Sequence, residues 1–431
     1  MEYLEIWVLV ISFVLLLVLG VPIAYSIGIS GTLTLLINVM PIPAFTTFSQ
    51  RMATGLDSFA LLAIPFFILA GQLMNQGGIA LRLIDFAKVL VGRLPGGLAF
   101  VNIMANMLFG AISGSAAASA SAIGSFMTPK MVEEGYDKPF AAAVNITSAT
   151  TGLVIPPSNI LIVYSLASGG VSIAALFIAG YVPGILTGLM LMGVAAAFAY
   201  KKNYPVGERT GFKTGVLKFF DAIPSLLLLI IVIGGILAGI FTATEASAIA
   251  VLYALILALI YGNVSIKDIP SILLKSVRVT SIVLLLVAAS MGMSWVMSFA
   301  NIPQNVSAGL LSISTNTIII LLIINMILLF VGVFMDMTPA VLIFTPIFLP
   351  IVVDLGIDPV HFGIIMVVNL TVGLCTPPVG SLLFIGCSVA NLSIVKVIRP
   401  LIPFFIAMIV ALMLITYIPI LSLWLPGVFG Y

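Results

Sequence analysis

Gly152-Leu-Val-Ile-Pro-Pro157 recurs in the second half of the chain as Gly373-Leu-Cys-Thr-Pro-Pro378, and this recurrence predicts a chain built from two repeats. The repeat offset is the shift in numbering that places Gly152 on Gly373. It also aligns further identical residues, namely Gly135 with Gly356, Asp137 with Asp358, Thr150 with Thr371 and Leu161 with Leu382. Two weakly similar halves are typical of membrane transporters built from internal repeats. We therefore predict two structural repeats, residues 1–218 and 219–431.

The composition is that of a protein embedded in lipid. Of 431 residues, 62% are hydrophobic and 7% are charged, whereas about a quarter of the residues of a soluble domain are charged. Apolar runs of about 20 residues, enough to cross a bilayer, recur along the chain. The expected fold class is an all-α polytopic membrane protein with ten spans: 6–20, 23–39, 58–76, 137–167, 171–200, 221–240, 243–261, 278–300, 358–390 and 397–425.

Two further apolar stretches, about 97–134 and 316–355, are interrupted in the middle. The first contains Ser113-Gly-Ser115 and the second contains Asp336-Met-Thr-Pro339. We predict that both are re-entrant hairpins, each of which enters and leaves the membrane on one face. Each half then has five spans, and this odd number predicts that the repeats are inverted and that the hairpin tips meet near the midplane from opposite faces.

The orientation follows from the basic stretch Lys201–Lys218, because short basic loops stay on the cytoplasmic side. The N-terminus is then expected in the periplasm. Two amphipathic segments, Gly78–Leu94 and Ser265–Thr280, are expected to lie in the cytoplasmic interface, unless one of them belongs to a longer membrane helix. A net charge of +2 argues against a nucleic-acid partner.

The proline pairs predict a broken helix in each half, within 137–167 and within 358–390. Proline removes backbone donors and unwinds the helix locally, and the freed carbonyl groups are tolerated at membrane depth where they line a cavity. Hydroxyl and amide side chains gather at the same places, and neutral hard oxygens are the ligands that sodium prefers. We therefore predict one sodium or substrate site per half, between a hairpin tip and the facing unwound segment.

The candidate site residues are small, hydroxyl-bearing or amide-bearing side chains near the breaks and tips. In the first half they are Ser113, Gly114, Ser115, Thr147, Thr150, Thr151, Gly152, Pro156, Ser158 and Asn159. In the second half they are Asp336, Thr338, Thr371, Gly373, Thr376, Pro377 and Gly380. Sodium is the expected coupling ion, and no cofactor is expected. Two cysteines and one histidine form no set of soft ligands for a structural zinc or an iron–sulfur cluster.

Each of these features also has a purely structural interpretation. Small residues allow tight helix packing, and proline kinks occur in membrane helices that have no further role. Asp336 is the sharpest candidate, because an ionisable group deep in an apolar hairpin is costly and usually functional, although it could simply cap a helix. Glu245 is expected to complement the positive end of a helix dipole.

Five motifs together resemble the large membrane subunit of tripartite ATP-independent periplasmic (TRAP) transporters, the DctM-like family. They are Phe109–Ser115, Gly152–Ser158, Gly239–Ala246, Phe334–Pro339 and Gly373–Gly380. The resemblance implies an elevator-type, sodium-driven importer of the bacterial inner membrane. It also implies a small four-helix DctQ-like subunit, expected as a separate chain, and a periplasmic DctP-like solute-binding protein. The family's substrates are organic acids such as C4-dicarboxylates and sialic acid, and sialic acid is favoured here.

Other classes of function are less compatible with the sequence. An intramembrane enzyme would need paired aspartates, His-Glu-x-x-His or a serine with histidine in the spans, and the sequence has none of these. A channel would need a continuous polar pore. The remaining alternative is a stand-alone sodium- or proton-coupled dicarboxylate carrier with a related inverted-repeat fold.

Overall fold

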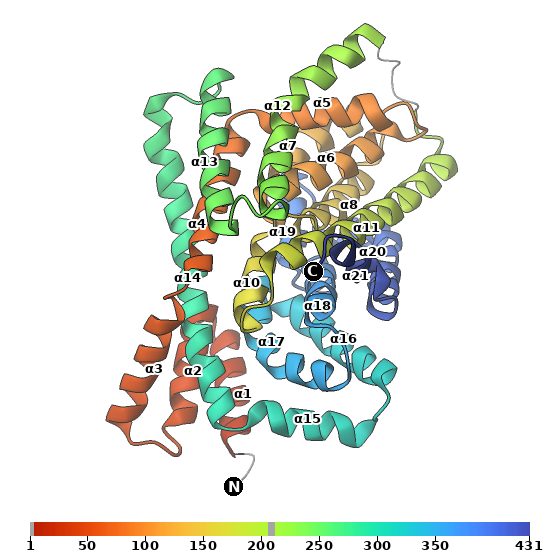
Figure 1. The fold of residues 1–431 in the computed structure, drawn as a ribbon. Coiled ribbons are helices and arrows are strands. Elements are labelled where there is room, and N and C mark those ends of the chain that lie inside the picture. The colour runs from red at the N-terminus through yellow and green to blue at the C-terminus, as the bar shows by residue number, and fades with distance from the viewer. Residues whose placement is uncertain (1–3, 206–211) are drawn as a thin grey trace.

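The computed structural model describes residues 4–205 and 212–431, and within these ranges the regular structure is entirely helical (Figure 1). Eight helices in the described ranges are long and apolar enough to cross a membrane, or nine if one bent pair counts as a span. The predicted all-α membrane fold is therefore confirmed. The number of ten spans stays a prediction, because the helices in the first two predicted spans have only 15 and 13 residues.

The helices form two bundles, which lie side by side in Figure 1. In the first bundle, on the left, α4 packs against α13, and α14 packs against α2 and α3. Its helices are α1 (Leu4–Val18), α2 (Ile23–Leu35), α3 (Pro41–Gly55), α4 (Ala63–Gln76), α12 (Phe212–Leu237), α13 (Ala243–Ile260) and α14 (Ile269–Phe299). A short 3-10 turn, η1 (Phe59–Leu62), leads into α4.

The second bundle contains the helix pairs of both predicted hairpins and both predicted broken helices. The re-entrant course of the hairpins stays a prediction, since α16 and α17 are each long and apolar enough to cross a membrane. From the first half it takes α6 (Gly97–Ser113), α7 (Ala116–Glu133), α8 (Lys138–Ala149), α9 (Thr151–Val154), α10 (Asn159–Ala167) and α11 (Ile173–Lys202). From the second half it takes α16 (Thr317–Phe334), α17 (Met337–Asp354), α18 (Pro359–Leu374), α19 (Ser381–Val389), α20 (Ile394–Tyr417) and α21 (Ile420–Val428). Tyr164 of α10 donates a hydrogen bond to the Pro359 carbonyl over 2.6 Å and so ties the two halves together inside this bundle.

Two shorter helices connect the bundles. In Figure 1, α5 (Ile79–Val91) lies across the top of the molecule, and α15 (Ile302–Ile313) lies across the bottom. Ion pairs of Arg82 with Asp221 and of Lys218 with Asp85 hold α5 against α12.

Local sequence signals explain where several helices begin. The side chains of Ser115 and Asp336 cap α7 and α17, and each accepts a hydrogen bond from a backbone N–H of the first turn. Thr242 and Glu245 form a reciprocal capping box at the start of α13, so Glu245 has the structural role expected for it. Proline in the first turn of α8 and α18 fits those positions, where no intrahelical N–H is needed.

The helix bounds of the two halves correspond at the repeat offset. Shifting α7 (Ala116–Glu133) by this offset gives the bounds of α17 (Met337–Asp354), and shifting α5 gives 300–312, close to α15. The helices α3 and α15 were not predicted from the sequence. The segment Ser265–Thr280 is not a separate interfacial helix: it forms a 3-10 turn (η2, Ile266–Asp268) and the beginning of the long α14, as the alternative interpretation allowed.

The basic stretch Lys201–Lys218, on which the predicted orientation rests, lies partly outside the described residues. The periplasmic position of the N-terminus therefore stays a prediction.

Candidate functional site

Both broken helices are interrupted at the proline pairs. Between α8–α9 and α10 the chain bends by 50°, and residues 155–158 are not helical. In the second half, residues 375–380 separate α18 from α19. The Pro156–Pro157 and Pro377–Pro378 peptide bonds are both cis.

Each broken helix touches the first helix of its own hairpin through a pair of glycines. A Cβ atom at Gly152 would lie 2.2 Å from the Cα atom of Gly110 in α6, and one at Gly373 would lie 2.6 Å from the backbone of Gly332 in α16. No real Cβ atom fits at such distances. The predicted site residues Gly152 and Gly373 are thus close-packing positions, as the structural interpretation of small residues held.

Each hairpin tip also meets the unwound segment of its own half. Gly114, in the left-handed conformation at φ 59°, lies against the side chain of Asn159, and a Cβ atom there would be 3.0 Å from Asn159 Nδ2. In the second half, the N–H of Gly380 donates to the carbonyl of Val333 over 3.2 Å. These contacts give the tip-to-break arrangement on which the predicted ion sites depend.

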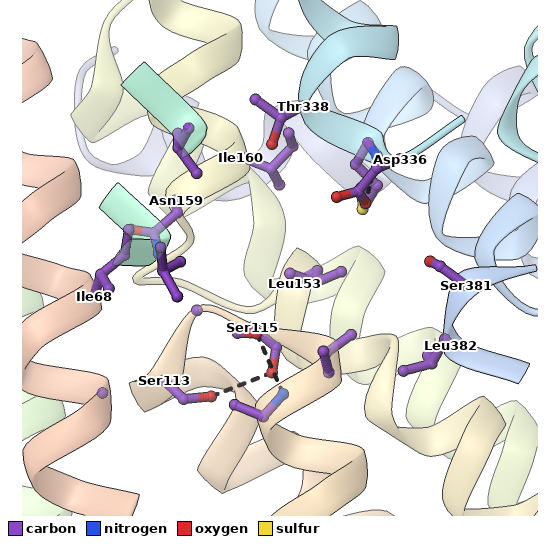
Figure 2. A pocket seen from close by; sticks show the side chains of 18 of the residues that line it. Ile68, Ser113, Ser115, Leu153, Asn159, Ile160, Asp336, Thr338, Ser381 and Leu382 are labelled. Atoms are coloured by element: carbon purple, nitrogen blue, oxygen red, sulfur yellow. Dashed lines mark hydrogen bonds between the residues drawn. The ribbon is translucent and has the colours of Figure 1, made fainter. Parts of the chain in front are cut away.

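A cavity of about 600 Å³ lies between the two bundles, bordered by both hairpin tips (Figure 2). Figure 2 shows Ser113 and Ser115 on the tip of the first hairpin and Asp336 and Thr338 on the second, around the same open space. Six predicted site residues line this cavity, namely Ser113, Gly114, Ser115, Asn159, Asp336 and Thr338.

The other predicted residues do not line the cavity. These are Thr147, Thr150, Thr151, Gly152, Pro156 and Ser158 in the first half, and Thr371, Gly373, Thr376, Pro377 and Gly380 in the second. The hydroxyl groups among them donate to carbonyls three to five residues earlier, for example Thr151 to Ser148 over 2.6 Å and Thr371 to Val368 over 2.6 Å. Each hydroxyl oxygen keeps lone pairs that could still coordinate a cation.

The lining also contains polar residues that are not among the predicted site residues. They are Gln72 and Asn75 of α4, Ser121 of α7 and Ser381 of α19. The signal available for Gln72 and Asn75 was a pair of amides at positions i and i+3 within a mostly apolar span, since polar groups in such spans tend to face a protein interior or a cavity.

The electrostatics of the cavity come from helix ends and one carboxylate. Four helices, α7, α10, α17 and α19, begin at this cavity, and residues of their first turns line it. A helix N-terminus offers free N–H groups and a positive partial charge. Asp336 is the one ionisable side chain among the described lining residues. The buried Asn159 Oδ1 atom has no hydrogen-bond partner. The site therefore suits an anion together with small cations.

Comparison with known protein families identifies the chain. The family model described as the DctM component of the tripartite ATP-independent periplasmic transporter matches residues 10–421. The chain belongs to this family. It is a multi-pass transporter permease and not an enzyme, and DctM proteins act as one component of a three-part system.

Individual DctM relatives align along nearly their whole length. The chain is 59% identical to YgiK of Salmonella typhimurium, over 97% of this chain and 96% of YgiK. It is 40% identical to the C4-dicarboxylate TRAP transporter large permease protein DctM of Pseudomonas aeruginosa, over 94% of each chain. It is 36% identical to the sialic acid TRAP transporter large permease protein SiaM of Vibrio cholerae, over 96% and 97% of the two chains.

Among solved structures, the YdaH transporter of Alcanivorax borkumensis shares the fold. The TM-score is 0.65 over 92% of this chain and 90% of that one, at 13% sequence identity. At this identity the likeness concerns the fold alone.

Proposed function

We propose that the chain is the large permease subunit of a sodium-driven importer of organic acid anions in the inner membrane. One observation carries the proposal: four helix N-termini and the carboxylate of Asp336 meet in one cavity between the two bundles. The N-termini favour an anion although the described lining contains no lysine or arginine. The carboxylate favours a cation that binds with it.

The sodium sites lie in each half beside a hairpin tip and its unwound segment. They use backbone carbonyls, hydroxyl oxygens and the free Asn159 Oδ1 in the first half, and Asp336 offsets the ion's charge in the second. Binding of sodium would also neutralise the site in part, which strengthens the binding of an acid. This coupling between ion and solute drives uphill transport.

Transport moves the second bundle against the first, in the manner of an elevator. The cavity at the boundary between the bundles supports this, as does the presence of only two short connecting helices, α5 and α15, in the described parts of the chain. The repeat-equivalent helices α5 and α15 lie at opposite ends of the molecule in Figure 1, which supports inverted repeats. The N-terminus is assigned to the periplasm.

The solute is of the type named for the DctM relatives, a C4-dicarboxylate or sialic acid. The partners are a small four-helix DctQ-like membrane subunit and a DctP-like periplasmic solute-binding protein, each as a separate chain.

Uptake into proteoliposomes that contain both membrane subunits tests this assignment. With an inward sodium gradient, labelled acid should accumulate only when the solute-binding protein and its solute are present outside. Uptake that is equally fast without the binding protein would overturn the tripartite assignment in favour of a stand-alone carrier.

A further inference from the structure

The wall of the cavity formed by the first bundle carries two amide side chains that the proposed mechanism does not use. The lining residues from this bundle are Ile64, Ile68, Gly71, Gln72 and Asn75 of α4, and Val279 and Val283 of α14. Gln72 and Asn75 are the polar side chains in this set. They lie three residues apart and therefore on one face of α4.

Both amides are free to bind a solute. Gln72 and Asn75 are only partly buried, and neither is hydrogen-bonded to another described residue. An amide offers two donors and one acceptor, so an amide without a protein partner in the cavity wall can bind a solute directly. By contrast, Asn263 of the same bundle donates its amide to the Gly77 carbonyl over 3.0 Å.

The fold itself does not require amides at these two positions. At the repeat offset, Gln72 corresponds to Met293 and Asn75 to Val296, both in α14. These two side chains are apolar and are about as fully buried as any in the bundle, at 1% and 0% exposure. The second repeat thus builds the equivalent helix without polar groups, so the amides of the first repeat serve something other than helix packing.

The wall formed by α4 lies across the cavity from the N-termini of α17 and α19. Figure 2 shows Ile68 of α4 on one side of the open space and Asp336 and Ser381 on the other, and Gln72 follows Ile68 by one helical turn. A Cβ atom at the neighbouring Gly71 would lie 3.0 Å from the Ser113 carbonyl, so this turn of α4 lies against the first hairpin tip. A solute whose carboxylate binds at the N-termini of α17 and α19 would direct its other end to the amides.

We infer that Gln72 and Asn75 are specificity-determining residues that bind the hydroxyl groups of the transported acid, so that the solute is a hydroxylated monocarboxylic acid. The inference rests on the proposed function. An amide pair recognises hydroxyl groups by donating and accepting hydrogen bonds, whereas a second carboxylate at this wall would need a cationic partner. The described lining offers no lysine or arginine for that purpose.

The test measures thermal stabilisation of the purified membrane complex by three acids in sodium buffer, without the solute-binding protein. Gluconate and hexanoate have the same chain length but differ in hydroxyl groups, and succinate is the dicarboxylate. A ligand that binds the folded protein stabilises it by an amount that rises with the logarithm of the ratio of its concentration to its Kd. The wild type should bind gluconate about tenfold more tightly than hexanoate or succinate, which corresponds to one or two hydrogen bonds.

The double variant Gln72→Leu with Asn75→Leu should lose this preference and bind gluconate and hexanoate about equally. Gln76→Leu is the matched control, because Gln76 is on the same helix but outside the cavity lining, and it should keep the preference.

Three results would overturn the inference: a wild type that prefers succinate, a wild type that does not distinguish gluconate from hexanoate, or a double variant that keeps the gluconate preference. If none of the three acids stabilises the wild type, the anion site itself is wrong and the inference falls with it. The proposed function and the role of the amides can fail separately. If sodium drives uptake of a carboxylate but the double variant keeps the gluconate preference, the transport function stands and only the role of the amides is rejected.

Discussion

Ser115 and Asp336 are equivalent residues at the same cavity. They correspond at the repeat offset, each caps an 18-residue helix, and the first turns of both helices line the cavity. The cap in the first half is a neutral hydroxyl, and the cap in the second half is a carboxylate. The two halves thus have the same backbone geometry at this position but differ in charge. Since the neutral Ser115 caps its helix, capping does not require the negative charge of Asp336.

Replacing Asp336 by asparagine separates these two roles. Asparagine caps a helix about as well as aspartate, so assembly and thermal stability should be preserved. The charge that offsets a bound cation would be lost, and the sodium concentration for half-maximal uptake should rise by about tenfold or more. The measurement is the sodium dependence of initial uptake in proteoliposomes.

Asp354→Asn is the control, because Asp354 ends the same helix and is exposed away from the cavity. It should leave the sodium dependence unchanged. Wild-type sodium dependence in Asp336→Asn would show that Asp336 is only a helix cap.

The glycine contacts predict a packing defect. In Gly152→Ala the new methyl group would collide with the Gly110 backbone of α6, and overpacking of this kind costs about 1–3 kcal/mol. The Tm of the purified protein should therefore fall. In Gly193→Ala, also within a helix, the new methyl group meets no atom within 4 Å, so the Tm should be unchanged or higher. Equal Tm values in the two variants would contradict the close approach of α6 and α9.

The two hairpins should open to opposite faces of the membrane. Glu133 and Asp354 end α7 and α17, are exposed and correspond to each other at the repeat offset. In a background with Cys375→Ala and Cys387→Ala, a single cysteine at one of these positions should react with an impermeant thiol reagent from one side, and a cysteine at the other position from the opposite side. Labelling of both positions from the same side would exclude inverted repeats.

Acid should weaken one contact at the membrane surface. The pKa of Asp137 is held below its usual value of 3.8, chiefly because Lys202 donates a hydrogen bond to its carboxylate. A lowered pKa stabilises the fold when the pH is above the pKa that the carboxyl group has in the unfolded chain. This stabilisation is lost as the pH falls through the pKa of the folded state. Because both side chains are about half exposed, it amounts to at most about 1 kcal/mol.

Lys202→Met should lower the Tm slightly at pH 7. Below pH 4 the variant should lose less stability than the wild type, because it has no ion pair to lose. Lys201→Met, at an exposed neighbouring position, should show neither effect. If the Tm values of the wild type and both variants fell by the same amount as the pH was lowered, the ion pair would be shown to make no contribution.

The sequence predicted the features that backbone chemistry controls. Pro156-Pro157 and Pro377-Pro378 mark both breaks, because proline restricts the backbone wherever it occurs. Ser113–Ser115 marks a hairpin tip, because Gly114 can adopt the positive φ that this turn has. Asp336 was found because a carboxylate is conspicuous in an apolar segment, and it does line the cavity.

Features that depend on packing were not predictable in the same way. The hydroxyls of Thr151 and Thr371 were expected at the site, but they bond to carbonyls of their own helices and lie outside the cavity lining. The amides of Gln72 and Asn75 were overlooked because which helix face borders the cavity depends on how the two bundles meet. The short helix α15 was missed because its hydrophobic pattern is too short to stand out from a loop.

The driving force for uptake, once measured, tests the proposed sodium coupling most directly. Proteoliposomes with both membrane subunits, and with the solute-bound binding protein outside, are given an inward sodium gradient, an inward proton gradient, or neither. We predict accumulation of the acid with the sodium gradient alone, and none with the proton gradient in sodium-free buffer, because the proposed ion sites consist mainly of neutral oxygens. Equal accumulation driven by the proton gradient without sodium would contradict this prediction and would make Asp336 a proton carrier.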